Sequence, residues 1–207
     1  MEDYIWYASY GSNISEERFM CYIRGGKPEG ATRTYEGCND KTPPVDQMPI
    51  NIPHELYFAK EAKVWNGGGV CFINPERDEQ VNTLGNMYLI TRAQFLEVVQ
   101  QENFTTEPIE IDFEKVRNRE SLVVRKNSWY GNLLYLGEEG GSPIFTFTNQ
   151  SFLKDEENPP NEHYLKTIMS GLITSHQLNT SELQAYFYSK KGINKPILKK
   201  AIDTLEK

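Results

Sequence analysis

The residues best suited to chemistry lie near the amino terminus, in the segment Tyr-Ala-Ser-Tyr-Gly-Ser-Asn at positions 7–13. An aromatic and β-branched run at 4–9 predicts a strand, and Ser15 followed by two glutamates predicts a helix over 15–24. Gly11 between these elements lets successive backbone N–H groups turn toward one point, beside the positive end of the helix dipole. With the side chains of Ser12 and Asn13, this loop could hold a carboxylate, a carbonyl oxygen or a developing oxyanion. The alternative is a turn that only caps the helix.

The sequence lacks the common phosphate-binding and metal-binding patterns. No GxGxxG is present, and no lysine follows the glycine loop as in GxxxxGK. Neither the cysteines nor the histidines form the close pairs that a zinc or haem site needs. These residues are Cys21, Cys38, Cys71, His54, His163 and His176. A nucleophilic Cys–His pair stays open, because such partners meet in space rather than in sequence.

Composition and charge restrict the expected partners. The chain has 207 residues, of which 12% are aromatic, and 22 basic against 29 acidic side chains give a net charge of −7. A general nucleic-acid binder needs a basic face, which this balance does not favour. No apolar run approaches a membrane span, and the acidic start MEDYIWY is unlike a signal peptide. With an odd number of cysteines, we expect a cytoplasmic protein with reduced thiols and no nucleic-acid or membrane partner.

The remaining pattern predicts strands in the middle of the chain and helices at its end, which is typical of an α+β fold. Short β-like runs stand at 55–59, 69–73, 84–90, 108–113, 121–124, 130–136 and 144–148. Thr91 predicts the start of a helix over 92–101, and helical periodicity returns in three segments from position 164 onward. Residues 27–53 contain several prolines and glycines, which predict a long surface loop or lid.

Four motifs together resemble one known family. Tyr10-Gly11-Ser12-Asn13 after an aromatic strand matches its hallmark loop, and Trp65-Asn66-Gly67-Gly68 matches its Trp-x-Gly-Gly sequence before a strand. A helix ending in an acidic turn stands at 95–103, and Tyr-x-x-x-Ile-x-x-Gly stands at 164–171 after a proline-containing loop. Because these landmarks occur in the family's order over residues 4–188, the chain resembles the γ-glutamylcyclotransferase-like, or AIG2-like, proteins.

The resemblance implies a small mixed β-barrel with flanking helices at 1–176, followed by a C-terminal helical extension at 177–207. It implies an enzyme of the acyltransferase or lyase type that acts on a small γ-glutamyl amide without metal or cofactor. The substrate's α-amine attacks its own γ-carbonyl, which releases 5-oxoproline and an amine. Glu102 matches the position of the catalytic base, and Asn103 replaces the glycine that often follows it, although asparagine can still adopt a positive φ. The expected substrate-binding residues are Tyr10, Gly11, Ser12, Asn13, Trp65, Gly67, Gly68 and Tyr164.

Other interpretations are open at this stage. Glu97 and Glu107 are alternative acids, and a protein with the same loop could bind a small carboxylate or amide without turning it over. A third possibility is an interaction module, for which an exposed apolar stripe with Ile168 and Leu172 would be needed. The long 27–53 segment and the C-terminal helices suggest a leaving amine larger than the simplest amino acid. The oligomeric state is not indicated by the sequence.

Overall fold

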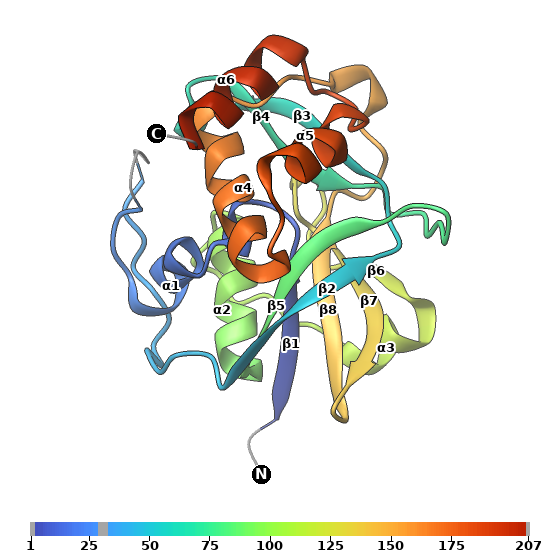
Figure 1. Ribbon diagram of the computed structural model, residues 1–207. Coiled ribbons are helices and arrows are strands. Elements are labelled where there is room, and N and C mark those ends of the chain that lie inside the picture. Colours follow the sequence, from blue (N-terminus) through green and yellow to red (C-terminus); the bar gives the residue numbers. More distant parts are fainter. Residues whose placement is uncertain (1–2, 29–32, 206–207) are drawn as a thin grey trace.

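A six-stranded mixed sheet runs through the centre of the computed structural model, which describes residues 3–28 and 33–205 (Figure 1). Its strand order is β2-β5-β1-β8-β7-β6, and neighbours are antiparallel except for the parallel pair β1 and β8. The strands span Tyr4–Ser9 (β1), Asp46–Ile52 (β2), Thr83–Thr91 (β5), Ser121–Val123 (β6), Asn132–Glu139 (β7) and Ser142–Thr148 (β8). β1 is therefore central, and its end leads directly into the Gly-Ser-Asn loop.

A separate two-stranded antiparallel sheet, β3 (Leu56–Ala62) and β4 (Gly68–Ile73), lies beside one end of the larger sheet (Figure 1). The expected α+β class is confirmed, but the strands form an open sheet rather than the expected closed barrel. β6 has only three residues and β2 exposes most of its side chains, so neither edge offers a long apolar strand for closure.

Helices flank the sheets, and the two helix starts examined in the sequence are confirmed. The Ser15 side chain accepts a hydrogen bond from the backbone N–H of Arg18, and Thr91 forms a capping box with Gln94. The α-helices are α1 (Glu16–Arg24), α2 (Arg92–Glu102), α3 (Phe113–Arg119), α4 (Glu162–His176), α5 (Thr180–Tyr188) and α6 (Lys195–Leu205). Single 3-10 turns are η1 (Ser12–Ile14), η2 (Lys63–Trp65) and η3 (Lys154–Glu156). In the part of the chain that the structure describes, no helix is long and apolar enough to cross a membrane.

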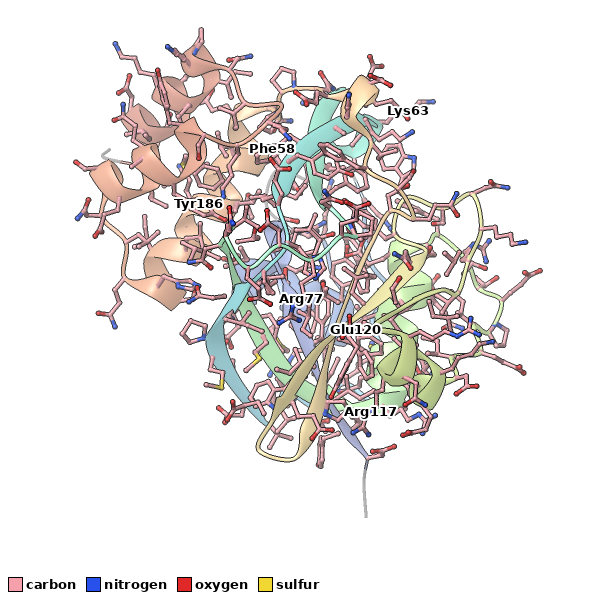
Figure 2. All side chains as sticks on the ribbon, turned by 90° about the vertical axis from the view of Figure 1, so that its right-hand side faces the viewer. Phe58, Lys63, Arg77, Arg117, Glu120 and Tyr186 are labelled. Atoms are coloured by element: carbon pink, nitrogen blue, oxygen red, sulfur yellow. The ribbon has the colours of Figure 1, made fainter. Side chains whose placement is uncertain are left out.

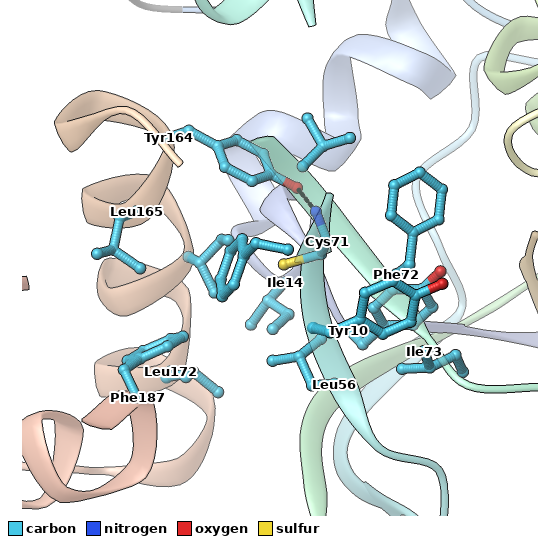
Figure 3. Packing of buried hydrophobic residues seen from close by; sticks show 14 of the residues in the cluster. Tyr10, Ile14, Leu56, Cys71, Phe72, Ile73, Tyr164, Leu165, Leu172 and Phe187 are labelled. Carbon is cyan, nitrogen blue, oxygen red and sulfur yellow. Dashed lines mark hydrogen bonds between the residues drawn. The ribbon is translucent and has the colours of Figure 1, made fainter. Parts of the chain in front are cut away.

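Alternate residues of β1 enter two hydrophobic clusters, one on each face of the sheet. Ile5 and Tyr7 belong to the cluster with α1 and α2. Trp6, Ala8 and Tyr10 belong to the cluster with the β3–β4 hairpin and α4–α6. Side chains of a strand point alternately to opposite faces, so a central strand covered on both faces is apolar at nearly every position. Figure 3 shows the second cluster, with Tyr10 among residues of β4 and α4.

Two segments differ from the sequence-based expectation. Residues 46–52, expected within a loop, form β2, and Pro49 is tolerated there because β2 is an edge strand with one unpaired side. Residues 108–113 were expected to form a strand, but the structure has an irregular segment that leads into α3. Asp112 starts this helix, because its side chain accepts a hydrogen bond from the Lys115 N–H at 3.0 Å.

The C-terminal helices share a core with the β3–β4 hairpin. Leu183 and Phe187 of α5 and Leu198 of α6 are buried in the same cluster as Tyr10. Ile168 and Leu172 of α4 are also buried, so the exposed apolar stripe that an interaction module would need is not formed by them.

Candidate functional site

A cavity forms where the end of β1, the start of α1, the end of α2 and the β3–β4 hairpin converge. Its walls are mostly aromatic, with a few polar and charged side chains. The lining side chains include Tyr7, Ser9, Tyr10, Ser12, Asn13, Arg18, Tyr22, Arg33, Tyr35, Trp65, Cys71, Glu102, Phe104, Trp129, Tyr130, Phe147 and Tyr164. Segments that are far apart in sequence therefore enclose one site.

The end of β1 is held against the neighbouring strand and against α4. The Tyr10 hydroxyl donates a hydrogen bond to the carbonyl of Phe147 at 2.7 Å. A Cβ atom on Gly11 would lie 3.2 Å from the Tyr164 hydroxyl, which is tighter than an ordinary contact. Gly11 has a φ of −115°, so its value here is its small size rather than a left-handed backbone.

The loop after Gly11 lines the cavity and has backbone N–H groups without partners in the loop. η1 is a single turn in which the Ile14 N–H donates to the Gly11 carbonyl at 3.0 Å. Such a turn leaves its first N–H groups without partners inside the turn. Within residues 3–28 and 33–205, no backbone hydrogen bond outside helices and strands uses the N–H of Ser12 or Asn13 as donor. Both residues line the cavity, so these donors are suited to a ligand oxygen.

Glu102 lies opposite this loop, at the last residue of α2. Its Oε1 accepts a hydrogen bond from Nδ2 of Asn13 at 3.0 Å, and the same amide donates to the Tyr7 hydroxyl at 3.3 Å. Burial raises the pKa of Glu102 above its ordinary value, although hydrogen bonding from Tyr22 and the nearby positive charge of Arg18 act in the opposite direction. A carboxyl group with a raised pKa can take up and return a proton near neutral pH.

A polar network on α1 supports this carboxyl group. Arg18 is 6% exposed; its Nη2 donates to the Tyr35 hydroxyl at 2.7 Å and its Nε donates to Ser12 Oγ at 3.4 Å. The hydroxyl groups of Tyr22 and Tyr35 form a hydrogen bond of 3.3 Å with each other. The network thus joins the Ser12 loop, α1 and the segment that carries Tyr35, and it places a cation near the half-buried Glu102.

The opposite wall comes from the β3–β4 hairpin and α4. Trp65 is buried, and its carbonyl accepts a hydrogen bond from Asn161 Nδ2 at 2.6 Å. The rings of Trp65 and Tyr164 have centroids 4.7 Å apart. The Tyr164 hydroxyl accepts a hydrogen bond from the Cys71 N–H at 3.1 Å, as Figure 3 shows. Burial raises the pKa of the Cys71 thiol, which opposes thiolate formation and disfavours a nucleophilic cysteine here.

The structure brings most of the sequence-predicted residues together. Tyr10, Gly11, Ser12, Asn13, Trp65, Glu102 and Tyr164 all line the cavity. Gly67 and Gly68 do not line it, because Gly68 instead makes room for α4: a Cβ there would lie 2.5 Å from the Asn161 backbone nitrogen. The alternative acids also lie elsewhere. Glu97 accepts hydrogen bonds from Asn39, and Glu107 is exposed.

Asn103 stands where the family often has glycine, but it does not use the positive φ that asparagine can adopt. Asn103 has a φ of −92°, and its side chain donates to the Val99 carbonyl at 2.8 Å. The positive φ, +50°, falls on Phe104. The residue with a positive φ after α2 is therefore Phe104 rather than Asn103, and the Phe104 ring lines the cavity.

Several cavity residues were not singled out in the sequence. Arg18 and Tyr22 stand four positions apart on the buried face of α1. A charged residue on an otherwise apolar helix face is the sequence feature that could have indicated a functional role for Arg18. Arg33, Tyr35 and Phe104 lie outside helices and strands, and no local pattern marks them.

Comparison with known sequences gives one extended match. No protein-family model matches the chain. Histone deacetylase 5 of Arabidopsis thaliana is 35% identical over an alignment of 212 positions, gaps included, which covers 93% of this chain and 31% of that protein. The chain thus spans about a third of the length of the curated relative that it matches.

Comparison with solved structures shows the fold. A structure described as gamma-glutamyl cyclotransferase has a TM-score of 0.52 and 14% identity, covering 98% of this chain and 99% of the other. An uncharacterized protein from Homo sapiens has a TM-score of 0.53 and 14% identity, with both chains fully covered. Likeness at this identity concerns the fold alone, and it confirms the fold that the sequence motifs led us to expect.

Proposed function

We propose that this chain, which has the γ-glutamylcyclotransferase-like fold, cleaves a γ-glutamyl amide by intramolecular cyclisation, releasing 5-oxoproline and an amine. The observation that carries the proposal is the contact between Glu102 and the loop after β1. A half-buried carboxyl group with a raised pKa lies 3.0 Å from Asn13, beside backbone donors that have no partner in the loop. Fold likeness alone would not support an activity.

In this reaction Glu102 acts as base and then as acid. The substrate's α-ammonium loses one proton to water, because only the neutral amine has a lone pair for attack. As the amine nitrogen bonds to the γ-carbonyl carbon, Glu102 takes the second proton from that nitrogen. The bond to the departing amine then breaks, and Glu102 returns the proton to that amine. The five-membered lactam and the free amine leave a carboxylate ready for another cycle.

The loop supplies the electrostatic part of catalysis. Negative charge develops on the γ-carbonyl oxygen as the new bond forms, and donors already aimed at that oxygen lower the barrier. The N–H groups of Ser12 and Asn13 are candidates for this role, since both residues line the cavity. The aromatic walls formed by Tyr10, Trp65 and Tyr164 would keep the glutamyl chain folded, so that amine and carbonyl meet.

The deciding experiment replaces the base without changing its shape. We expect Glu102→Gln to lower 5-oxoproline release from γ-glutamyl-alanine by about 10²- to 10⁴-fold, because positioned general acid–base catalysis contributes that much. Substrate binding, measured by calorimetry, should persist, since Gln Oε1 can still accept from Asn13. Glu97→Gln and Glu107→Gln are matched controls outside the cavity and should keep wild-type turnover.

Two outcomes would contradict the proposal. Unchanged turnover in Glu102→Gln would show that Glu102 is not the catalytic base. Absence of 5-oxoproline release from any γ-glutamyl amide in the wild-type protein, with binding present, would favour the alternative of a binding protein that is catalytically silent. We assign no deacetylase activity to this chain, because it covers only 31% of the relative that bears that name.

A further inference from the structure

An arginine that lines the cavity, Arg33, makes four contacts through its guanidinium group. Nη1 and Nη2 of Arg33 both donate to the carbonyl of Gln101, each at 3.2 Å. Its guanidinium carbon lies 4.5 Å from the centroid of the Tyr35 ring and 4.4 Å from that of the Phe104 ring. Two hydrogen bonds and two cation–π contacts therefore orient one guanidinium, and we call Arg33, Tyr35 and Phe104 the Arg33 clamp.

Phe104 is the member of the clamp that the fold does not explain. Its side chain is 68% exposed, and its φ of +50° is unfavourable for a bulky residue. An exposed ring gains little from burial in the protein core. The contacts of its ring with Arg33 and the cavity give a reason for its position, and its exposure marks this side of the cavity as the mouth.

The clamp leaves Arg33 with unused donors and an unbalanced charge. A guanidinium carries five N–H groups, and among the described residues only the two bonds to Gln101 use them, which leaves three for a ligand. Among the described residues that line the cavity, the Lys, Arg, Asp and Glu side chains are Arg18, Arg33 and Glu102. Arg18 is buried: its Nη2 and Nε donate to Tyr35 and Ser12, and its Nη1 has no partner among the described residues. The cavity thus has an excess positive charge, and Arg33 carries it at the mouth.

In the proposed reaction, the glutamyl group lies at Glu102 and the loop, so the departing amine points toward the mouth. We infer that Arg33 is a specificity-determining residue, which binds an anionic group on the departing amine and selects amines that carry a carboxylate over neutral ones. This inference rests on the proposed function. The inference about Arg33 does not require the larger leaving amine that the long 27–53 segment suggested.

The test uses two substrates that differ only at the group read by Arg33. γ-Glutamyl-alanine has a carboxylate on its departing amine, and γ-glutamyl-alaninamide has a neutral amide there. We expect the wild-type protein to prefer the first by about 10- to 100-fold in kcat/KM, mainly through KM, since a hydrogen bond to a charged group has this strength. Arg33→Gln should abolish the preference, which is measured as the ratio of the two kcat/KM values because Arg33 also lowers the pKa of Glu102. Circular dichroism shows whether the variant is folded.

Two further variants sharpen the result. Arg33→Lys keeps the charge but loses the planar, stacked geometry, so we expect only part of the preference to remain. Arg77→Gln is the matched control. Arg77, which is labelled in Figure 2, lies on the β4–β5 connection. It pairs with Glu79 and does not line the cavity. It should retain the full preference.

The outcomes separate this inference from the proposed function. If wild type releases 5-oxoproline equally well from both substrates, or if Arg33→Gln lowers both equally, Arg33 does not select the departing amine, although the proposed function stands. If neither substrate is cleaved, calorimetric affinities of the same pair decide about Arg33, and the proposed function is decided separately by release of 5-oxoproline from other γ-glutamyl amides. A carboxylate preference in binding that is lost in Arg33→Gln supports the inference. Equal affinities, or no binding, overturn it.

Discussion

Asn13 and Glu102 lie 89 positions apart in the chain, yet Asn13 Nδ2 is 3.0 Å from Glu102 Oε1. This contact joins the loop after the central strand to the end of α2. The same amide nitrogen lies 3.3 Å from the Tyr7 hydroxyl, so two partners orient the side chain. The ionised form of Glu102 is thereby stabilised in a place where burial otherwise disfavours it.

Removal of the Asn13 donor should shift the pH dependence of turnover. A hydrogen bond to a carboxylate favours its charged form, so Asn13→Leu should raise the pKa of Glu102 further. Because the base must be ionised, the acidic limb of the kcat/KM profile should move to higher pH, with activity at pH 6 falling by about tenfold or more. The profile is measured by 5-oxoproline release between pH 5 and pH 9.

Asn39→Leu provides the matched control for this profile. Asn39 Nδ2 donates to Glu97 Oε1 at 2.9 Å, so the chain contains a second Asn–Glu pair that ends on α2 but lies outside the cavity. Loss of the Asn39–Glu97 hydrogen bond should leave the acidic limb of the kcat/KM profile at the same pH. An unshifted limb in Asn13→Leu, with turnover intact, would show that this hydrogen bond does not set the protonation of the base.

The half-buried carboxyl group of Glu102 should also reduce stability as the pH rises. The folded-state pKa of Glu102 lies above its ordinary value of 4.5, so the unfolded chain ionises first. Stability is then lost progressively between the unfolded and the folded pKa. Glu102→Gln removes this loss, so its free energy of unfolding should match that of wild type below pH 4.5 and exceed it at pH 8. Denaturant unfolding at several pH values measures the difference.

The comparison with Glu97→Gln controls for the change in net charge. Glu97 contacts Asn39 outside the cavity, so its replacement should not produce a stability gain that grows with pH in the same way. A pH-independent difference between Glu102→Gln and wild type would mean that the Glu102 pKa is not raised in the folded protein.

We propose that the C-terminal helices unfold together with the rest of the chain rather than as a separable extension. Phe187 of α5 is fully buried in the cluster that includes Tyr10, so Phe187→Ala should cost about 3–5 kcal/mol of unfolding free energy. One cooperative transition should persist at lower denaturant concentration, measured by circular dichroism and tryptophan fluorescence together. Tyr188→Ala is the control, since Tyr188 is 55% exposed and should cost about 0.5 kcal/mol or less. Two separate transitions would instead favour an independent extension at 177–207.

Local sequence predicted the features that depend on neighbours in the chain. The aromatic β1, the Ser15 cap and the Thr91 capping box are formed by residues within a few positions of one another, and the structure has all three. Local sequence was misleading where the secondary structure of a segment depends on its partner strand or on a helix cap. Pro49 suggested a loop, but an edge position next to β5 accommodates it. The run at 108–113 suggested a strand, but Asp112 begins a helix there.

The sequence by itself determined the central strand, the helix starts and the glycine loop, because backbone preferences and capping act over a few residues. Motif resemblance added Glu102 as the partner of that loop. Only the tertiary structure decided that Asn13 contacts Glu102, that Arg18 and Tyr35 form a buried network beside it, and that Arg33 is clamped at the mouth. These contacts join side chains from distant segments, and the burial that raises the pKa of Glu102 exists only once those segments have packed together.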